Sequence, residues 1–170
     1  ENAYLYCGFN RDVTKEEVAE RIQNNTILEV LNKIFVKKGD VIFVPAGTVH
    51  AIGAGILICE IQQSSDCTYR LYDYERKDKY GNLRELHINK ALDVINYNKY
   101  VPQILEHTTE HFEMYEKKVI SSCKYFECMM YCLNGKMELP AIKESFTSVV
   151  CLSGNATMWT EQNQEEKMRF

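Results

Sequence analysis

Residues 39–50 read Gly-Asp-Val-Ile-Phe-Val-Pro-Ala-Gly-Thr-Val-His, and this stretch indicates the fold. Its first glycine turns the chain into the all-apolar run 41–44, which predicts a short strand buried on both faces. Pro45 and Gly47 predict a tight bend at the end of that strand. His50 then begins the returning strand, where a neutral imidazole on a rigid backbone is a good ligand for a divalent metal.

The spacing G-x5-P-x-G-x2-H resembles the second of the two motifs of the cupin superfamily, whose fold is a small jelly-roll β-barrel. This resemblance implies a mainly β chain in which His50 points into the mouth of the barrel, with its ring near Glu60. The alternative is a histidine packed in the core of an ordinary hairpin. A dry apolar environment around the His50 ring would favour that alternative.

The flanking sequence predicts both strands and a helical insertion. Alternating or apolar runs predict strands at 2–9, 49–52, 56–63 and 69–74. Thr14 and Glu17 have the spacing of a capping box, and the apolar stripe after them predicts one broken helix or two short helices over 15–31. A further short helix is predicted at 89–97.

Residues 98–170 are predicted to form a second, smaller β region that is truncated. Strands are expected at 112–121, 124–133 and 145–153, because these segments are rich in Tyr, Phe, Cys, Met and Val. The polar residues 161–170 show no packed pattern.

Length and composition restrict the possible classes of protein. A chain of 170 residues predicts one domain, or one domain and a piece of another. The net charge of −4 and the absence of a long basic run argue against nucleic-acid binding, and no apolar run is long enough for a membrane span. Seven cysteines without a C-x-x-C pair predict free thiols and a cytoplasmic protein. The start at Glu1, directly in a strand-like segment, indicates a piece of a longer protein.

The residues after His50 narrow the family. Residues 51–66, Ala-Ile-Gly-Ala-Gly-Ile-Leu-Ile-Cys-Glu-Ile-Gln-Gln-Ser-Ser-Asp, and 68–74, Thr-Tyr-Arg-Leu-Tyr-Asp-Tyr, resemble type I mannose-6-phosphate isomerase in its short bacterial form. Gly8-Phe9 and Arg84-Glu85-Leu86-His87 resemble the same family. The resemblance implies that 1–97 is the C-terminal part of a catalytic cupin domain. It also implies a zinc-dependent enzyme that interconverts mannose 6-phosphate and fructose 6-phosphate.

The resemblance also implies a metal site that this chain fills only in part. The family binds zinc through a Gln, two His and a Glu, and His50 matches the second histidine. The other ligands are expected upstream of Glu1. Because a zinc site needs about four ligands, the chain alone is expected to bind zinc weakly, to be inactive and to have an incomplete barrel. Unpaired strand edges could then join two copies into a homodimer.

Arg70 and Glu60 match the catalytic arginine and an active-site carboxylate of the family. Aldose–ketose exchange passes through an enediol, so a carboxylate can shuttle the proton and a guanidinium can stabilise the enediolate or bind phosphate. The alternation of 56–63 places Glu60 on the face of Ile56 and Ile58, which predicts a buried position. Structural ion pairs are the alternative explanation for both residues.

Two other functions remain open at this point. A non-catalytic, sugar-sensing cupin would keep the fold without the full ligand set, and a dioxygenase would use a different metal site. His107-Thr-Thr-Glu110-His111 also spells H-x-x-E-H, the order of an inverted zinc peptidase. The two threonines favour a strand here, and a strand turns Glu110 away from the histidines. A solvated strand is therefore the prediction for this segment.

Overall fold

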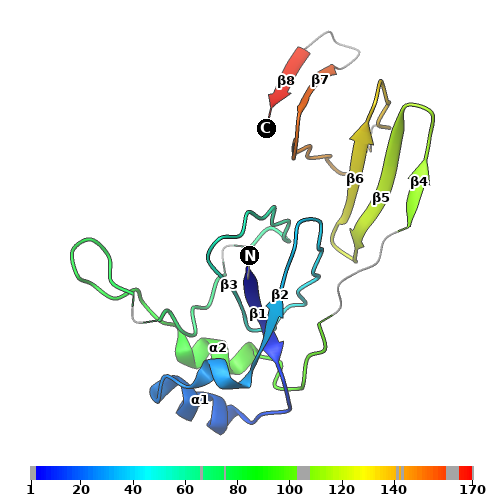
Figure 1. Cartoon of the computed structure of the whole chain (residues 1–170). Coiled ribbons are helices and arrows are strands. Elements are labelled where there is room, and N and C mark those ends of the chain that lie inside the picture. The colour runs from blue at the N-terminus through cyan, green and yellow to red at the C-terminus, as the bar shows by residue number, and fades with distance from the viewer. Residues whose placement is uncertain are drawn as a thin grey trace.

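The computed structural model describes residues 3–65, 67–74, 76–102, 108–140, 142, 144–159 and 165–169. Within these residues the chain is mainly β, with three antiparallel sheets and two α-helices. Figure 1 shows the first sheet above the two helices, and the later strands in a separate group. In the described residues no sheet closes on itself.

The first sheet has the strand order β2-β1-β3, with β1 in the centre. Its strands are β1 (Tyr4–Phe9), β2 (Leu31–Phe35) and β3 (His50–Ile52). Cys7 of β1 lies opposite His50 of β3 in the register. Residues directly opposite each other on neighbouring strands share a face of the sheet, so the register places His50 and Cys7 on one face.

The helices cover this sheet through a compact apolar core. They are α1 (Lys15–Gln23), the 3-10 helix η1 (Ile27–Val30) and α2 (Ile88–Val94). The core residues are Phe9, Val13, Val18, Ile22, Ile27, Val30, Leu31, Leu71, Ala91 and Leu92. Val18 and Ile22 lie one helical turn apart and are both buried, as the apolar stripe predicted. The prediction of two short helices over 15–31 is therefore confirmed, and α2 confirms the helix predicted at 89–97.

The N-terminus of α1 confirms half of the predicted capping box. Thr14 Oγ1 accepts a hydrogen bond from the Glu17 backbone N–H at 3.2 Å. The Glu17 carboxylate, however, binds two guanidinium groups, those of Arg11 and Arg21. Because charge-assisted bonds to arginine are stronger than a bond to a neutral N–H, the carboxylate is held by the arginines. The reciprocal half of the predicted box was therefore wrong.

Asn32 fixes an irregularity in the pairing of β1 with β2. The register shifts between Tyr6 and Phe9 of β1. At this bulge the Asn32 side-chain amide lies 3.1 Å from the carbonyl oxygens of both Cys7 and Phe9 and 2.8 Å from that of Tyr100. One side chain thus binds the central strand to the segment that follows α2.

Asn32→Ala is expected to lower the free energy of unfolding by about 2 kcal/mol, because half-buried carbonyl groups lose their donor. Asn82→Ala is the matched control, since the Asn82 amide makes an exposed bond to Asp78 at 3.3 Å. We expect that control to stay within about 0.5 kcal/mol of the parent. Urea denaturation followed by circular dichroism measures both changes. Equal losses in the two variants would contradict the role given to Asn32.

The second region forms two further sheets. One has the order β4-β5-β6 and the other pairs β7 with β8. Their strands are β4 (Thr109–His111), β5 (Tyr115–Ser122), β6 (Glu127–Leu133), β7 (Asn155–Trp159) and β8 (Glu165–Arg169). The strands predicted at 112–121 and 124–133 are confirmed as β5 and β6. The strand predicted at 145–153 was wrong, because pairing begins later, at Asn155. The prediction of no pattern over 161–170 missed β8.

Three predicted strands of the first region do not form. Residues 56–63 and the described residues of 69–74 have no strand, and the run 41–44 holds only a single bridge residue. Phe43 is 37% exposed and Leu57 is 83% exposed, so neither segment is buried on both faces. A strand needs a neighbouring strand to pair with, and no described strand pairs with these segments.

Two expectations from composition can also be compared with the structure. In the described part of the chain, no helix is long and apolar enough to cross a membrane. All seven cysteines are free, as the absence of a C-x-x-C pair predicted.

Candidate functional site

The predicted bend before His50 is present and is held on two sides. The Thr48 backbone N–H donates to the Pro45 carbonyl at 3.2 Å and closes the turn. Asn96 N–H, just after α2, donates to the Gly47 carbonyl at 2.9 Å, and Gly8 N–H of β1 donates to the Val49 carbonyl at 2.7 Å. The start of β3 is thereby fixed against both the helix end and the central strand.

The contact of the His50 ring with a backbone carbonyl favours the tautomer in which Nε2 is free to bind a metal. Its Nδ1 lies 2.9 Å from the Thr48 carbonyl oxygen. Because a carbonyl oxygen can only accept, Nδ1 carries the proton, and Nε2 keeps its lone pair in the neutral ring. In this chain His50 is exposed, so its ring is not packed in a dry core of described residues. Cys7, opposite in the sheet, is fully buried, and burial raises the pKa of its thiol.

Glu60 does not have the buried position that the strand pattern predicted. It lies in the extended segment 56–63 and is exposed, as are Leu57 and Ile58. The alternating sequence predicted which residues would share a face if this segment were a strand. The segment has no described strand partner, and no described neighbour covers Glu60. His50 and Glu60 form no hydrogen bond with each other in the described residues. That the His50 ring lies near Glu60 stays a prediction.

Arg70 is half-buried and held by main-chain groups. Its backbone N–H donates to His87 Nδ1 at 3.1 Å, and its backbone carbonyl accepts from His87 N–H at 2.8 Å. Its guanidinium donates from Nη1 to the Glu85 carbonyl oxygen at 3.1 Å. Among the described residues the Arg70 side chain makes no ion pair, so the structural salt bridge weighed as an alternative is not found there. Its other guanidinium donors have no partner among the described residues.

Sequence reasoning gave no role to two residues that organise this region. His87 precedes α2 and binds the Arg70 backbone through both its ring and its own N–H. Asp73 is 6% exposed and forms ion pairs with Arg76 and Arg84. A buried carboxylate that pairs with two arginines is a signal that only the folded structure provides, since the sequence shows Asp73 among tyrosines and charges.

No complete metal site is assembled in the described residues. They contain no group of three or more His, Cys, Asp or Glu side chains able to hold a metal ion. His107 of the H-x-x-E-H sequence lies outside the described residues. His111 is an exposed end residue of β4, and its Nδ1 lies 3.0 Å from Glu116 Oε1. The prediction of a solvated strand at this point is confirmed for the part that the structure describes.

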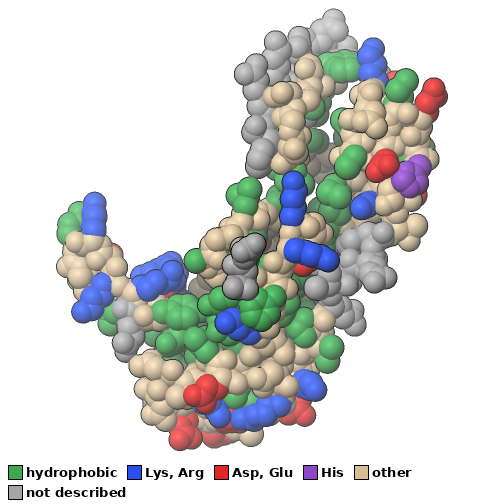
Figure 2. Space-filling model, viewed as in Figure 1, with side chains coloured by type: hydrophobic (Ala, Val, Ile, Leu, Met, Phe, Trp, Pro, Cys, Tyr) green, Lys and Arg blue, Asp and Glu red, His purple; other side chains and the backbone are tan. Residues whose placement is uncertain are grey.

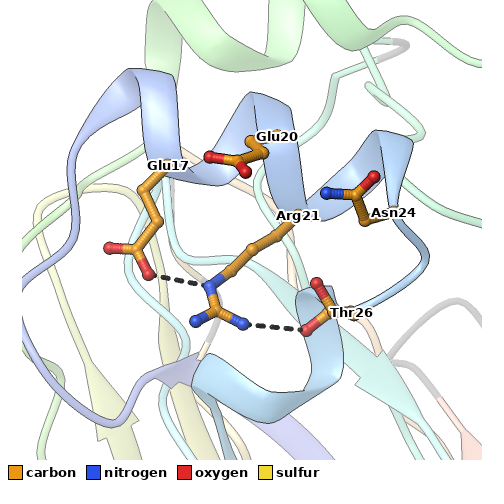
Figure 3. A pocket seen from close by; sticks show the side chains of 5 residues that line it. All are labelled: Glu17, Glu20, Arg21, Asn24 and Thr26. Carbon is orange, nitrogen blue, oxygen red and sulfur yellow. Dashed lines mark hydrogen bonds and ion pairs between the residues drawn. The ribbon is translucent and has the colours of Figure 1, made fainter.

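A shallow polar depression of about 190 Å3 lies at α1 and the turn after it. Its lining residues are Glu17, Glu20, Arg21, Asn24 and Thr26 (Figure 3). Hydrogen bonds from Arg11 and Arg21 lower the pKa of Glu17 to about 2. Because Arg21 also binds the Thr26 carbonyl, at 3.5 Å, its charge already has partners. His50, Glu60 and Arg70 do not line the depression, and we assign it no function.

The chain was compared with family models, with curated proteins and with solved structures. No family model matches the chain. Mannose-6-phosphate isomerase ManA of Bacillus subtilis (strain 168) is 42% identical over 160 residues, which cover 92% of this chain and 49% of the relative. Mannose-6-phosphate isomerase of Streptococcus mutans serotype c is 37% identical over 150 residues, covering 88% of this chain and 47% of the relative.

A solved structure extends the comparison. The crystal structure of the mannose 6-phosphate isomerase from Bacillus subtilis matches with a TM-score of 0.80 and 28% identity, over 99% of this chain and 52% of that chain. The chain is thus a mainly β protein with the cupin fold of that enzyme. It is a homologue of the mannose-6-phosphate isomerases, and the resemblance found in the sequence is confirmed. The chain spans about half the length of the curated relatives it matches.

Proposed function

We propose that this chain is part of a mannose-6-phosphate isomerase that interconverts mannose 6-phosphate and fructose 6-phosphate through an enediol. The similarity to isomerases of that name over about nine-tenths of the chain carries the proposal. Its partner is then a phosphorylated hexose. The free cysteines suit a reducing cytoplasm, where we place the protein.

Arg70 and Glu60 are the residues of this chain that we propose for catalysis. The half-buried guanidinium of Arg70 would stabilise the negative charge that develops on the enediolate. Its position is fixed by the contacts to Glu85 and His87 before substrate arrives. Glu60 is exposed and accessible, so its carboxylate can take a proton from one carbon and return it to the next.

His50 is the proposed metal ligand, and zinc is the proposed ion. The contact of Nδ1 with the Thr48 carbonyl supports this role, because it favours a proton on Nδ1 and leaves Nε2 to coordinate. A bound zinc would polarise the sugar oxygens as a Lewis acid. The described residues contain no group of side chains that could complete the site around His50. We propose that the other ligands come from the half of the isomerase to which this chain shows no match.

The function is tested by restoring that part. We expect the chain alone to show no turnover and weak zinc binding in a coupled assay for fructose 6-phosphate, because one ligand cannot hold the ion tightly. A chimaera that joins this chain to the unmatched half of B. subtilis ManA should bind zinc stoichiometrically and turn over mannose 6-phosphate.

Two outcomes would overturn parts of this proposal. A folded chimaera that binds zinc without turnover would favour the non-catalytic or dioxygenase alternatives. Robust turnover by the 170 residues alone would show that they contain a ligand set outside the one proposed. Removal of zinc by a chelator, followed by its return, controls for the metal in both measurements.

A further inference from the structure

An arm, residues 76–84, projects from the chain just before α2 (Figure 1). Lys77 pairs with Leu83 as an antiparallel bridge. Asp78 closes the turn, because its Oδ1 accepts from the backbone N–H groups of Tyr80 at 2.8 Å and Asn82 at 2.9 Å. Figure 2 shows Lys and Arg side chains on this arm. The carboxylate of Asp78 is therefore hydrogen-bonded within the turn.

Asp73 joins the two ends of the arm. Its Oδ1 lies 2.5 Å from Arg76 Nη2 and 3.5 Å from Arg84 Nη1. Because both nitrogens contact one oxygen, they lie no more than 6.0 Å apart, the sum of these two distances. The Asp73 side chain is 7% exposed, whereas those of Arg76 and Arg84 are 62% and 50% exposed. The buried carboxylate therefore holds two accessible guanidinium groups side by side, and we call this pair the arginine clamp.

Arg70 belongs to the same region. Its guanidinium binds the carbonyl of Glu85, the residue directly after Arg84. Arg70 therefore approaches the backbone next to the clamp, whereas the side chains of Arg76 and Arg84 share the carboxylate of Asp73. Each guanidinium has five N–H donors and uses only some of them here. The clamp therefore places two exposed guanidinium groups, with donors that Asp73 does not use, around one buried carboxylate.

We propose that the arginine clamp, Arg76 and Arg84, binds the phosphate group of a phosphate monoester, with Asp73 as a positioning residue; this rests on the function proposed above. A phosphate monoester carries a charge of about −1.5 to −2 at pH 7, opposite in sign to the two guanidinium groups. Arginine forks match phosphate oxygens bidentately. Two nitrogens within 6.0 Å can each donate to a different oxygen of one phosphate. A phosphate held there leaves Arg70 for the sugar end of the substrate.

Binding to the purified 170-residue chain tests this inference. Isothermal titration calorimetry would measure the binding of three compounds separately: inorganic phosphate, mannose 6-phosphate and mannose. Each is titrated into the parent chain and into the variants Arg84→Gln and Arg76→Gln. Lys79→Gln is the matched control: it removes the same charge from the tip of the arm, where Lys79 lies over the Tyr80 ring at 4.9 Å. Circular dichroism shows whether each variant is folded.

We expect both clamp variants to bind mannose 6-phosphate and inorganic phosphate about tenfold more weakly, since each loses a charge-assisted contact. Lys79→Gln should stay within about twofold, because an exposed charge at a distance is screened. Mannose without phosphate should show no difference among the variants. Phosphate-ester binding without binding of inorganic phosphate would still support the clamp if the clamp variants weaken it.

Several results would overturn the inference. One is that the parent chain binds neither phosphate compound, and another is that the clamp variants bind them as tightly as the parent does. A third is that Lys79→Gln loses as much affinity as the clamp variants, which would indicate a general charge effect. The isomerase assay of the chimaera separates this inference from the proposed function. Turnover with an unchanged KM in Arg84→Gln would reject the clamp and keep the isomerase. Phosphate binding lost in the clamp variants, with an inactive chimaera, would keep the clamp and reject the isomerase.

Discussion

Arg70→Lys is expected to lower kcat of the chimaeric isomerase about 100-fold while zinc binding and folding are retained. The contacts of Arg70 with His87 use the Arg70 backbone, and a lysine preserves them. The guanidinium, however, can bind the Glu85 carbonyl and still present further donors in a fixed plane. An ammonium ion is a point charge that cannot do both in the same geometry, so stabilisation of the enediolate is lost and the ground state is little affected.

Steady-state kinetics of mannose 6-phosphate turnover measure this effect, with Arg11→Lys as the matched control. Arg11 pairs with Glu17 on the surface of α1 and contacts none of the proposed site residues. We expect that control to keep the kcat of the parent chimaera. Near-parental turnover by Arg70→Ala would remove Arg70 from the mechanism.

The elements that sequence reasoning located are those whose signals are local. The Thr14 cap and the Val18–Ile22 spacing fix α1 within a few residues, and the Pro45–Thr48 bend closes on its own hydrogen bond. β5 and β6 are also local, because they pair with each other across a short connection. Such features need no distant partner, so the sequence is sufficient to predict them.

The elements that sequence reasoning missed depend on pairing between strands that are distant in the sequence. Residues 56–63 alternate as a strand does, yet no described strand pairs with them. β2 has the alternating burial of a strand from Leu31 onward, but its first residue also fits the apolar stripe of the helix before it. β8 is polar and is defined only by its pairing with β7. Hydrophobic pattern alone cannot show which backbone is available as a partner.

The candidate site divides in the same way. The motif located His50 and its bend, and the tautomer follows from a neighbour two residues away, Thr48. The burial of Glu60 was predicted from alternation and was wrong, because burial requires something to cover the face. The clamp held by Asp73 brings together residues from both ends of a hairpin, and its charges resemble an ordinary solvated run in the sequence. Only the fold shows that they meet.

Gly8→Ala is expected to destabilise the chain more strongly than the loss of the Asn32 amide does. Gly8 has φ +66°, in the left-handed region that a non-glycine residue enters at a cost of about 1–2 kcal/mol. A Cβ at this position would also lie closer than 3.0 Å to both Cβ and Cγ of Tyr100. Tyr100 cannot move away freely, because its N–H donates to the Phe9 carbonyl at 2.8 Å and its carbonyl accepts from Asn32. The clash must therefore be relieved by shifting β1 or the segment after α2.

Gly81→Ala separates the two costs. Gly81 has φ +87° at the turn of the arm, but a Cβ there meets nothing within 4 Å. The control therefore carries the backbone penalty without the clash, and we expect it to cost about 1–2 kcal/mol. Gly8→Ala should cost on the order of 3–5 kcal/mol, since overpacking adds to the same penalty. Such a loss is a large fraction of the roughly 5–15 kcal/mol that stabilises a typical domain, so the variant is expected to show a greatly lowered urea midpoint or no cooperative transition. Free energies of unfolding that agree within about 1 kcal/mol in the two variants would show that β1 and Tyr100 can separate at little cost, and that the Gly8 bulge does not hold the central strand in place.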